Sequence, residues 1–422
     1  MNALDPDQAA VGERVPPAPS AGASRVFIHL NLVFCLLLQR FCVFVGGGAI
    51  YWCLPVFLGS LGWLLWTGRA RLRIGGTLAF GGFAIVALFA TLVAVNTPDQ
   101  RISGISLPSL GSVLVLYLGL LAAPTQRFDG SRTLALVAIY LRVIAAAGIA
   151  QYALQFAGLS VFAFIDWLPA LRPVLVEPYF NYHPVVAYGS SIMRSNGFVL
   201  LEPSIFSQVL MLAVVVDVFV RRDWRFLPLY GVAYLMTYAG TGLLAFAIAA
   251  ALSLVFAPRA SGRLLALIAA GAVLSALAAL ALPGLVAGLA GRTSELGYSG
   301  TSASARYLVQ FDVLRAFSGE LRTVIGFGPG ALERMGTSMA GSINPALKIA
   351  FEYGIIGLAL FATFLIGTWW RRDMAIVSLY LLANYQLGGG YLLFMPFVIL
   401  ATLICLWSAP TSSAPSPPES RW

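Results

Sequence analysis

The sequence predicts an all-α polytopic membrane protein with about twelve transmembrane helices and two long segments on the outer side. The first observation is composition: 59% of the 422 residues are hydrophobic, 10% are charged, and the mean hydropathy is +0.86. The second is that apolar runs of about 20 residues, long enough to cross a hydrocarbon core, recur along the chain. The third is that the basic residues fall in small clusters between these runs. This composition excludes a soluble globular protein, and the scattered net charge of +9 is not the continuous basic face that binds nucleic acid.

Each apolar run gives one expected helix, in chain order at about 26–46, 49–67, 74–95, 105–123, 133–157, 200–220, 227–239, 241–257, 264–282, 345–370, 374–389 and 391–408. The range 227–239 is too short for a straight helix to cross the core, so we expect it to be broken or to share its end with the turn at 239–242. Together the helices form one membrane domain, residues 26–408. The Pro- and Ala-rich residues 1–25 are expected to be a disordered cytoplasmic tail, and residues 409–422 a second cytoplasmic tail.

The arginines predict the orientation of these helices. If the N-terminus lies inside, every short inner loop is basic, as the positive-inside rule requires. The loops carry Arg69, Arg71 and Arg73; Arg127 and Arg132; Arg221, Arg222 and Arg225; Arg259 and Arg263; and Arg371 and Arg372. Both termini are then cytoplasmic, and the two long segments, residues 158–199 and 283–344, face outward. Long loops in compact proteins usually carry function.

The stretch from Met193 to Gln208 is the first candidate site, because it brings an arginine and a glutamate to the mouth of a helix. Desolvating ionisable groups at this depth is costly, so they mark functional sites. Pro203 suits the first turn of a helix, which makes Glu202 its N-cap residue. Alternatively, Glu202 only caps the helix and Arg194 only binds lipid headgroups.

The outer segments are rich in arginine, which the positive-inside rule does not explain. Arginine suits an anionic ligand such as a phosphate or a pyrophosphate. Residues 303–317 have helical spacing of apolar side chains, with Arg306 in the first turn. A cation there is unfavourable for the helix dipole, so Arg306 either binds an anionic partner or is a surface arginine.

Polar residues inside the expected helices need partners. Arg142 lies near the middle of its helix and must face a partner or a wet cavity, whereas Arg40 can extend to the interface. Lys348 and Glu352 are four residues apart and can pair on one face, as a structural salt bridge or as part of a site. Asp217 needs no special role near the inner end of its helix.

The sequence lacks the residue patterns that metal sites, nucleotide binding and disulfide frameworks need. The two histidines do not have metal-ligand spacing, there is no Asp-x-Asp motif or Walker sequence, and the four cysteines lie in apolar runs as packing residues. We therefore expect neither a metal nor a cofactor. The glycine-rich residues 326–330 lack the strand and helix that frame a nucleotide-binding loop, so we expect a tight turn.

Three blocks of the chain resemble the O-antigen polymerase and O-antigen ligase superfamily of bacterial envelope glycosyltransferases, over about residues 133–372. The first block is RSNGF at 194–198 followed by EPSIF at 202–206; the second is TYAGTGLLA at 237–245; the third is SASAR at 302–306, GFGPG at 326–330 and NPALKIAFEYG at 344–354. The second block lacks the arginine of the family pattern. Ile343 stands where ligases carry a histidine before the asparagine, which favours a polymerase over a ligase.

The resemblance implies a multi-helix bundle of the GT-C type in the bacterial inner membrane, with a large periplasmic loop. It implies transfer of a growing glycan from its polyprenyl pyrophosphate to the next lipid-linked repeat, without a metal. The implied partners are the polyprenyl-pyrophosphate-linked oligosaccharide, membrane lipids, and a chain-length regulator or export complex. The expected catalytic residues are Glu202, Arg194 and Arg306, and the expected substrate-binding residues are Arg142, Asn344, Lys348, Glu352 and Gly328.

Two other functions stay open from the sequence. One is a ligase of the same superfamily. The other is a secondary transporter or lipid-glycan flippase with Arg142 and Glu202 lining its pathway. Two similar halves would favour a transporter, but the long segments are not placed symmetrically along the chain.

Overall fold

A computed structural model describes residues 21–45, 48–99, 101–177, 180, 184–186, 190–258, 261–281, 313, 315, 322–335, 343–388 and 390–410. These residues are mostly helical, consistent with an all-α membrane protein. The expected tails 1–20 and 411–422, and most of the second long segment, lie outside them.

Every range predicted as a span contains a helix. The helices are α1 (Ala21–Leu32, continued by a π-helical turn to Leu37), α2 (Cys53–Trp66), α3 (Ile74–Asn96), α4 (Leu107–Leu118), α5 (Thr133–Leu154), α7 (Pro203–Val214, continued by a π-helical turn to Arg221), α8 (Leu227–Leu235), α9 (Thr241–Phe256), α10 (Ser261–Ala281), α15 (Pro345–Trp369), α16 (Ala375–Leu387) and α17 (Met395–Leu406). The short helices α6 (Phe164–Trp167) and α14 (Arg322–Ile325) lie between them in the chain.

Four helical ranges of the described chain are long and apolar enough to cross a membrane: Ile74–Asn96, Thr133–Ala157, Pro203–Arg221 and Pro345–Trp369. Most of the remaining expected spans contain shorter helices, and the expected span 264–282 contains the 21-residue helix Ser261–Ala281. The helix at 227–239 has nine residues, which confirms that it is short.

Two small antiparallel strand pairs, of which the first is a hairpin, replace ends of the predicted spans. Strand β1 (Cys42–Val45) pairs with β2 (Gly48–Tyr51), so the expected helices at 26–46 and 49–67 are wrong at these ends. Strand β3 (Ala70–Leu72) pairs with β4 (Ala122–Pro124). In β1 the sequence CVFV is rich in β-branched and aromatic residues, and its hydrophobicity alone does not separate a strand from a helix.

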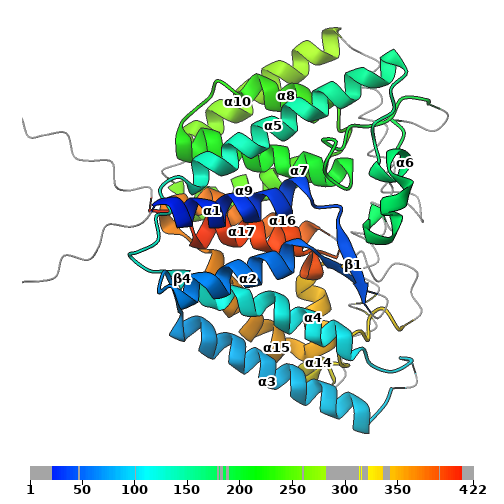
Figure 1. Cartoon of the computed structure of the whole chain (residues 1–422), viewed down its shortest axis with the longest axis vertical. Helices are drawn as coiled ribbons and strands as arrows, with labels where there is room; N and C mark the ends of the chain where they lie inside the picture. The colour runs from blue at the N-terminus through cyan, green and yellow to red at the C-terminus, as the bar shows by residue number, and fades with distance from the viewer. Residues whose placement is uncertain are drawn as a thin grey trace, which may run out of the picture.

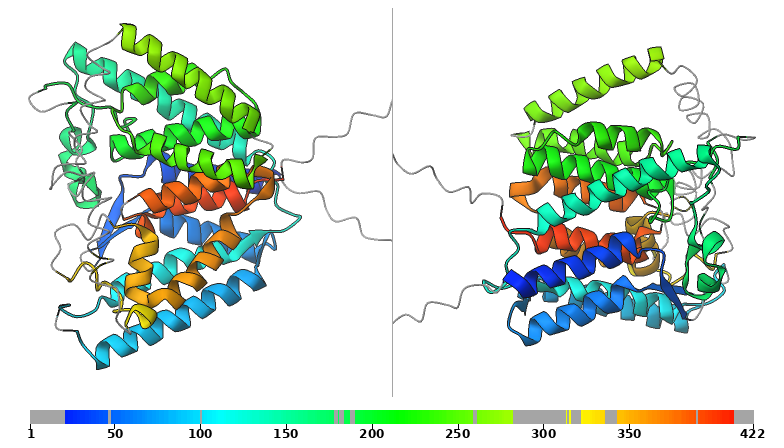
Figure 2. Two further views of the ribbon diagram at one scale, coloured as in Figure 1. Left: turned by 180° about the vertical axis from the view of Figure 1, so that it is seen from behind. Right: turned by 45° about the horizontal axis from the view of Figure 1, so that its top comes forward.

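The long helices lie side by side, and the two ends of the bundle differ (Figure 1). The start of α1, the end of α17 and the β3–β4 strand pair lie at one end, which we call the terminal end. Helix α6 and the β1–β2 hairpin lie at the other, the hairpin end. Figure 2 shows the same separation from behind and from above. Hydrogen bonds tie the terminal end together: Thr133 Oγ1 donates to the Trp407 carbonyl at 2.8 Å, and the Arg371 guanidinium donates to the Ser408 carbonyl at 2.9 Å.

The basic clusters of the short loops gather at the terminal end. Arg73, which follows β3, donates to the Gly367 carbonyl near the end of α15, and Arg221 donates to the Ala135 carbonyl near the start of α5. Arg263 donates to the Phe219 carbonyl at 2.9 Å. The chain therefore separates its loop arginines from the hairpin end, as a membrane orientation signal requires.

Candidate functional site

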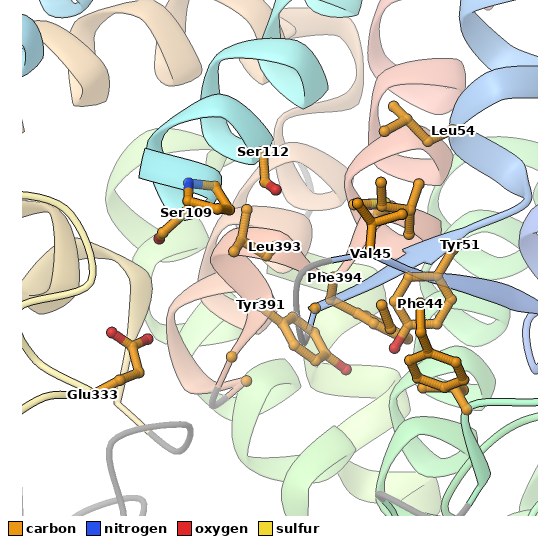
Figure 3. Close-up of a pocket in the computed structure, with 18 of the residues that line it drawn as sticks. Phe44, Val45, Tyr51, Leu54, Ser109, Ser112, Glu333, Tyr391, Leu393 and Phe394 are labelled. Atoms are coloured by element: carbon orange, nitrogen blue, oxygen red, sulfur yellow. The ribbon is translucent and has the colours of Figure 1, made fainter. Parts of the chain in front are cut away.

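A cavity of about 910 Å³ opens at the hairpin end of the bundle (Figure 3). Its described lining comes from the β1–β2 hairpin and the start of α2, the start of α4, residues 176 and 180, the start of α7, the turn from Gly330 onward, and the connection from α16 to α17. Its size is in the range of pockets that bind small molecules and cofactors. It collects the ends of helices that are far apart in the sequence, which is why the chain order alone does not show it.

The cavity has an apolar wall and a polar wall. The apolar wall consists of Phe44, Val45, Leu54, Leu393 and Phe394. The polar wall includes Ser106, Ser109 and Ser112 at the start of α4, Ser204 and Gln208 on α7, and the charged residues Glu202, Glu333 and Arg334. The Ser109 hydroxyl is buried and has no hydrogen-bond partner among the described residues. A buried polar atom without a partner is costly, so it is available for a ligand or water.

Glu202 lies at the N-cap position of α7, before Pro203, as the sequence predicts. Its side chain makes no capping hydrogen bond to the backbone. Instead it accepts a hydrogen bond of 2.9 Å from the Ser204 hydroxyl, and both residues line the cavity. The alternative that Glu202 serves only as a helix cap is therefore not supported, because the capping hydrogen bond is missing.

The first two sequence blocks come together around the start of α7. The Gly242 N–H donates to the Ser207 hydroxyl at 3.2 Å, and a Cβ at Gly242 would lie 2.3 Å from the Ser207 carbonyl oxygen. Helices α7 and α9 therefore cross with their backbones in close contact. Tyr380 of α16 donates to the Gln208 carbonyl at 2.7 Å. These contacts hold the start of α7, and hence Glu202, against the cavity.

The described residues include one of the two predicted catalytic arginines, Arg194. Arg194 Nε donates to the Val185 carbonyl at 2.8 Å, and Arg194 is not among the residues that line the cavity. Arg306 lies outside the described residues, as does most of the predicted helix 303–317. Within the described part of the chain, Arg334 is the basic residue of the cavity wall. Arg334 belongs to the arginine-rich outer segments, but no local sequence pattern predicts its position at the cavity.

The glycine-rich residues 326–330 pack against a break in α15. Gly354 interrupts this helix with φ 73°, and Figure 2 shows the change of direction. The break frees the carbonyls of Phe351 and Glu352, which accept hydrogen bonds of 2.9 Å from the N–H groups of Phe327 and Gly328. A Cβ at Gly354 would lie 2.0 Å from the Val324 carbonyl oxygen, so only glycine fits there.

This packing decides the position of two predicted substrate-binding residues. Gly328 lies against α3, because a Cβ there would be 2.7 Å from Ala94, and it does not line the cavity, whereas Gly330 does. Asn344 caps α15 by accepting the Leu347 N–H at 2.7 Å. The predicted tight turn at 326–330 is confirmed by positive φ angles at its glycines.

Lys348 and Glu352 pair as predicted, and a third residue joins them. Lys348 Nζ lies 3.4 Å from Glu352 Oε1 and also pairs with Glu333, which the sequence analysis did not single out. Glu333 lines the cavity, whereas Lys348 and Glu352 are buried behind it. The charged group therefore reaches the cavity through Glu333.

Arg40 does not extend to the interface, and this expectation is wrong. It is fully buried, pairs with the equally buried Glu177, and donates to the carbonyls of Phe162 at 3.1 Å and Leu200 at 2.7 Å. The Glu177 carboxylate also accepts the N–H groups of Phe164 and Ile165, at 2.9 and 2.8 Å. This pair joins α1 to the segment 158–199, and Glu177 was missed because it lies 137 residues from Arg40.

Arg142 has the partner that its position demands. Its guanidinium lies 2.9 Å from Asp217 and 3.1 Å from Asp223, and 3.5 Å from the centroid of the Phe226 ring. Asp217 also accepts a hydrogen bond of 2.6 Å from the Tyr230 hydroxyl, so it does have a role. Arg142 does not line the cavity. The geometry fits structural support and not the predicted substrate contact.

Comparisons of the chain with models of protein families, with curated proteins and with solved structures gave no match.

Proposed function

We propose that the chain is a metal-independent membrane glycosyltransferase that polymerises lipid-linked repeats, with its cavity on the outer side of a bacterial inner membrane. The growing glycan would be transferred from polyprenyl pyrophosphate to the next lipid-linked repeat. The observation that carries the proposal is the position of Glu202: its carboxylate, not used as a helix cap, lines a large cavity at the end of the bundle opposite to the loop arginines.

The lining of the cavity supports a substrate with a lipid part and a sugar part. The aromatic and aliphatic residues of the β1–β2 hairpin suit a polyprenyl chain, and the hydroxyls of α4 and α7 suit sugar hydroxyls. Arg334 is placed to contact a pyrophosphate, because a guanidinium offers a fork of donors to phosphate oxygens. It would stabilise the charge that develops on the leaving group.

The residue roles follow from these positions. Glu202 would orient the acceptor hydroxyl, with Ser204 fixing its carboxylate. Arg334 would take the role that the sequence gave to Arg194, and Arg306 stays a predicted phosphate contact from the second long segment. Lys348 and Glu352 would act through Glu333 at the cavity wall.

The test uses purified protein in detergent with lipid-linked repeats, without added metal and without a membrane gradient. Wild type is expected to give a ladder of polymer. Glu202→Gln keeps the shape of the side chain, and we expect it to reduce the initial rate about 10²-fold or more, the usual range for a group that handles the reacting proton or orients its donor. Binding of the lipid-linked repeat is expected to persist.

Asp99→Asn is the matched control, because Asp99 lies in the loop before α4, pairs with Arg101 at 2.7 Å, and does not line the cavity. Its ladder should equal that of wild type. An unchanged ladder in Glu202→Gln removes Glu202 from the site. Wild-type protein that forms no polymer but moves the lipid-linked repeat across liposomes is a carrier, and the polymerase proposal fails.

A further inference from the structure

A charged triad at one wall of the cavity consists of one exposed and two buried residues. It consists of Glu333 on the turn after Gly330, and Lys348 and Glu352 on the first half of α15. Lys348 Nζ contacts both carboxylates, that of Glu333 directly and that of Glu352 at 3.4 Å. Glu333 is 42% exposed and lines the cavity, whereas Glu352 is fully buried. The triad therefore connects solvent in the cavity with a carboxylate in the protein interior.

The charges of the triad do not balance. Two carboxylates share one ammonium group, so the fully ionised triad carries a net charge of −1. Both carboxylate oxygens of Glu352 are buried without a hydrogen-bond partner among the described residues, so the ammonium is their closest compensation. Two carboxylates that share one ammonium group leave room for one proton between them, because a single added proton makes the group neutral. Lys348 is the only lysine of the chain.

Three of the helices packed against α15 do not offset this imbalance. Helices α3, α16 and α17 carry no charged residue. The Tyr353 hydroxyl is a neutral group beside the Glu352 carboxylate. The charged and titratable groups on the packed elements are Arg334 beside Glu333, Arg322 on α14, Tyr353 on α15, Tyr380 and Tyr385 on α16, and Cys405 on α17.

We propose that Glu333 is a catalytic base at the cavity wall, and that Lys348 and Glu352 are positioning residues that give this triad room for one proton. The inference rests on the proposed glycosyl transfer. The acceptor O–H bond breaks and its proton goes to Glu333. The oxygen bonds to the anomeric carbon, and the bond from that carbon to the pyrophosphate breaks with its electron pair leaving on the phosphate. The triad then becomes neutral, and it releases the proton to water in the cavity before the next cycle.

The pH profile of polymerisation tests the assignment. Wild type should lose activity as the pH falls, because a triad that already holds its proton cannot accept another. Glu333→Gln removes the base, and we expect a loss of about 10²–10⁴-fold. Glu352→Gln keeps Glu333 but removes the excess negative charge. The acidic limb of the pH profile, where activity is lost as the pH falls, should therefore move to lower pH, and the maximal rate should fall. Lys348→Arg keeps the positive charge and should retain the limb.

Asp99→Asn is again the control. Hydrogen bonds from the Arg101 side chain hold the pKa of Asp99 down at about 2, so Asp99 stays ionised throughout the range and its loss cannot move the limb. Wild-type rates and profiles in both Glu333→Gln and Glu352→Gln overturn the assignment and leave the polymerase function intact. Loss of the limb in Glu202→Gln alone would make Glu202 the base and also overturns it.

A second measurement does not depend on activity. The infrared absorption of protonated carboxyl groups, recorded on the purified protein during an acid titration, should include a component that both Glu333→Gln and Glu352→Gln change and Asp99→Asn does not. An identical titration in all variants contradicts proton uptake by the triad. If wild type makes no polymer, the polymerase function fails and the catalytic role fails with it; the infrared titration then reports on proton uptake alone.

Discussion

At the residue scale, two arginines join distant parts of the chain. The buried Arg40 connects the end of the first helical range to the segment 158–199 through Glu177 and several carbonyls, and the half-buried Arg142 connects α5 to the end of α7 and the loop after it. Burying an ion costs several kcal/mol unless its partner and hydrogen bonds compensate, so removing one partner leaves an expensive charge behind. These residues are needed for the fold of the site and do not touch its cavity.

We predict that Glu177→Gln destabilises the protein by about 3–5 kcal/mol, because it leaves the buried Arg40 guanidinium without its counter-charge. Thermal unfolding of the purified protein, followed by tryptophan fluorescence, measures the change. Arg101→Gln is the control: it removes one partner of an ion pair in which Arg101 is 49% exposed, and such pairs contribute about 0–1 kcal/mol. Equal melting temperatures for Glu177→Gln and wild type would show that the Arg40–Glu177 pair does not stabilise the fold.

Arg142 and Arg334 should separate stability from substrate binding. Arg142→Gln is expected to lower the unfolding temperature while the KM for the lipid-linked repeat, measured on the folded fraction, stays the same. Arg334→Gln is expected to leave the unfolding temperature unchanged. It should lower kcat/KM by about 10²–10³-fold, because it removes a contact to the charge on the leaving group. A raised KM in Arg142→Gln with unchanged stability would return Arg142 to the substrate site.

At the element scale, the sequence locates the helices but not their interruptions. Apolar runs predict every long helix, and Pro203 predicts the start of α7, because these signals are local. The β1–β2 hairpin and the break in α15 depend on contacts with other segments, so hydropathy does not show them. The cavity needs both features, since β1 forms one wall and the break holds the turn that carries Glu333.

We predict that Gly354→Ala disrupts the turn after Gly330 and lowers polymer yield. The new methyl group would lie 2.0 Å from the Val324 carbonyl oxygen, and φ 73° is unfavourable for alanine. Gly367→Ala in the second half of the same helix is the control, since no atom lies within 4 Å of its Cβ position and alanine favours the helix. Yield and limited proteolysis measure both. A normal turn and yield in Gly354→Ala would mean that the break is not required.

At the scale of the whole molecule, the two ends of the bundle have different chemistry. The loop arginines and both ends of the described chain lie at the terminal end, and the cavity lies at the hairpin end (Figure 1). From the positive-inside rule we predict that the terminal end lies in the cytoplasm and that the cavity lies outside. The direction of the polymerase proposal depends on this orientation.

Cysteine labelling tests it. With the native cysteines replaced, Ser103→Cys at the hairpin end should react in intact cells with a thiol reagent that cannot cross the inner membrane. Arg372→Cys at the terminal end should react only after that membrane is opened. All four native cysteines are buried and free, so their replacement by small apolar residues should be tolerated. The reverse labelling pattern would place the cavity in the cytoplasm and contradict export of the polymer.

The serine face of α4 has one more consequence. Ser109 and Ser112 are three residues apart, a step of about 4.5 Å along the helix axis, and Ser106 caps the helix before them. Ser109 and Ser112 offer the same neutral hydroxyl, so a ligand that shifts from one to the other exchanges its contact for an equivalent one. Such a wall resists sliding only weakly. A wall of this kind suits an elongating strand that must advance after every addition without first letting go.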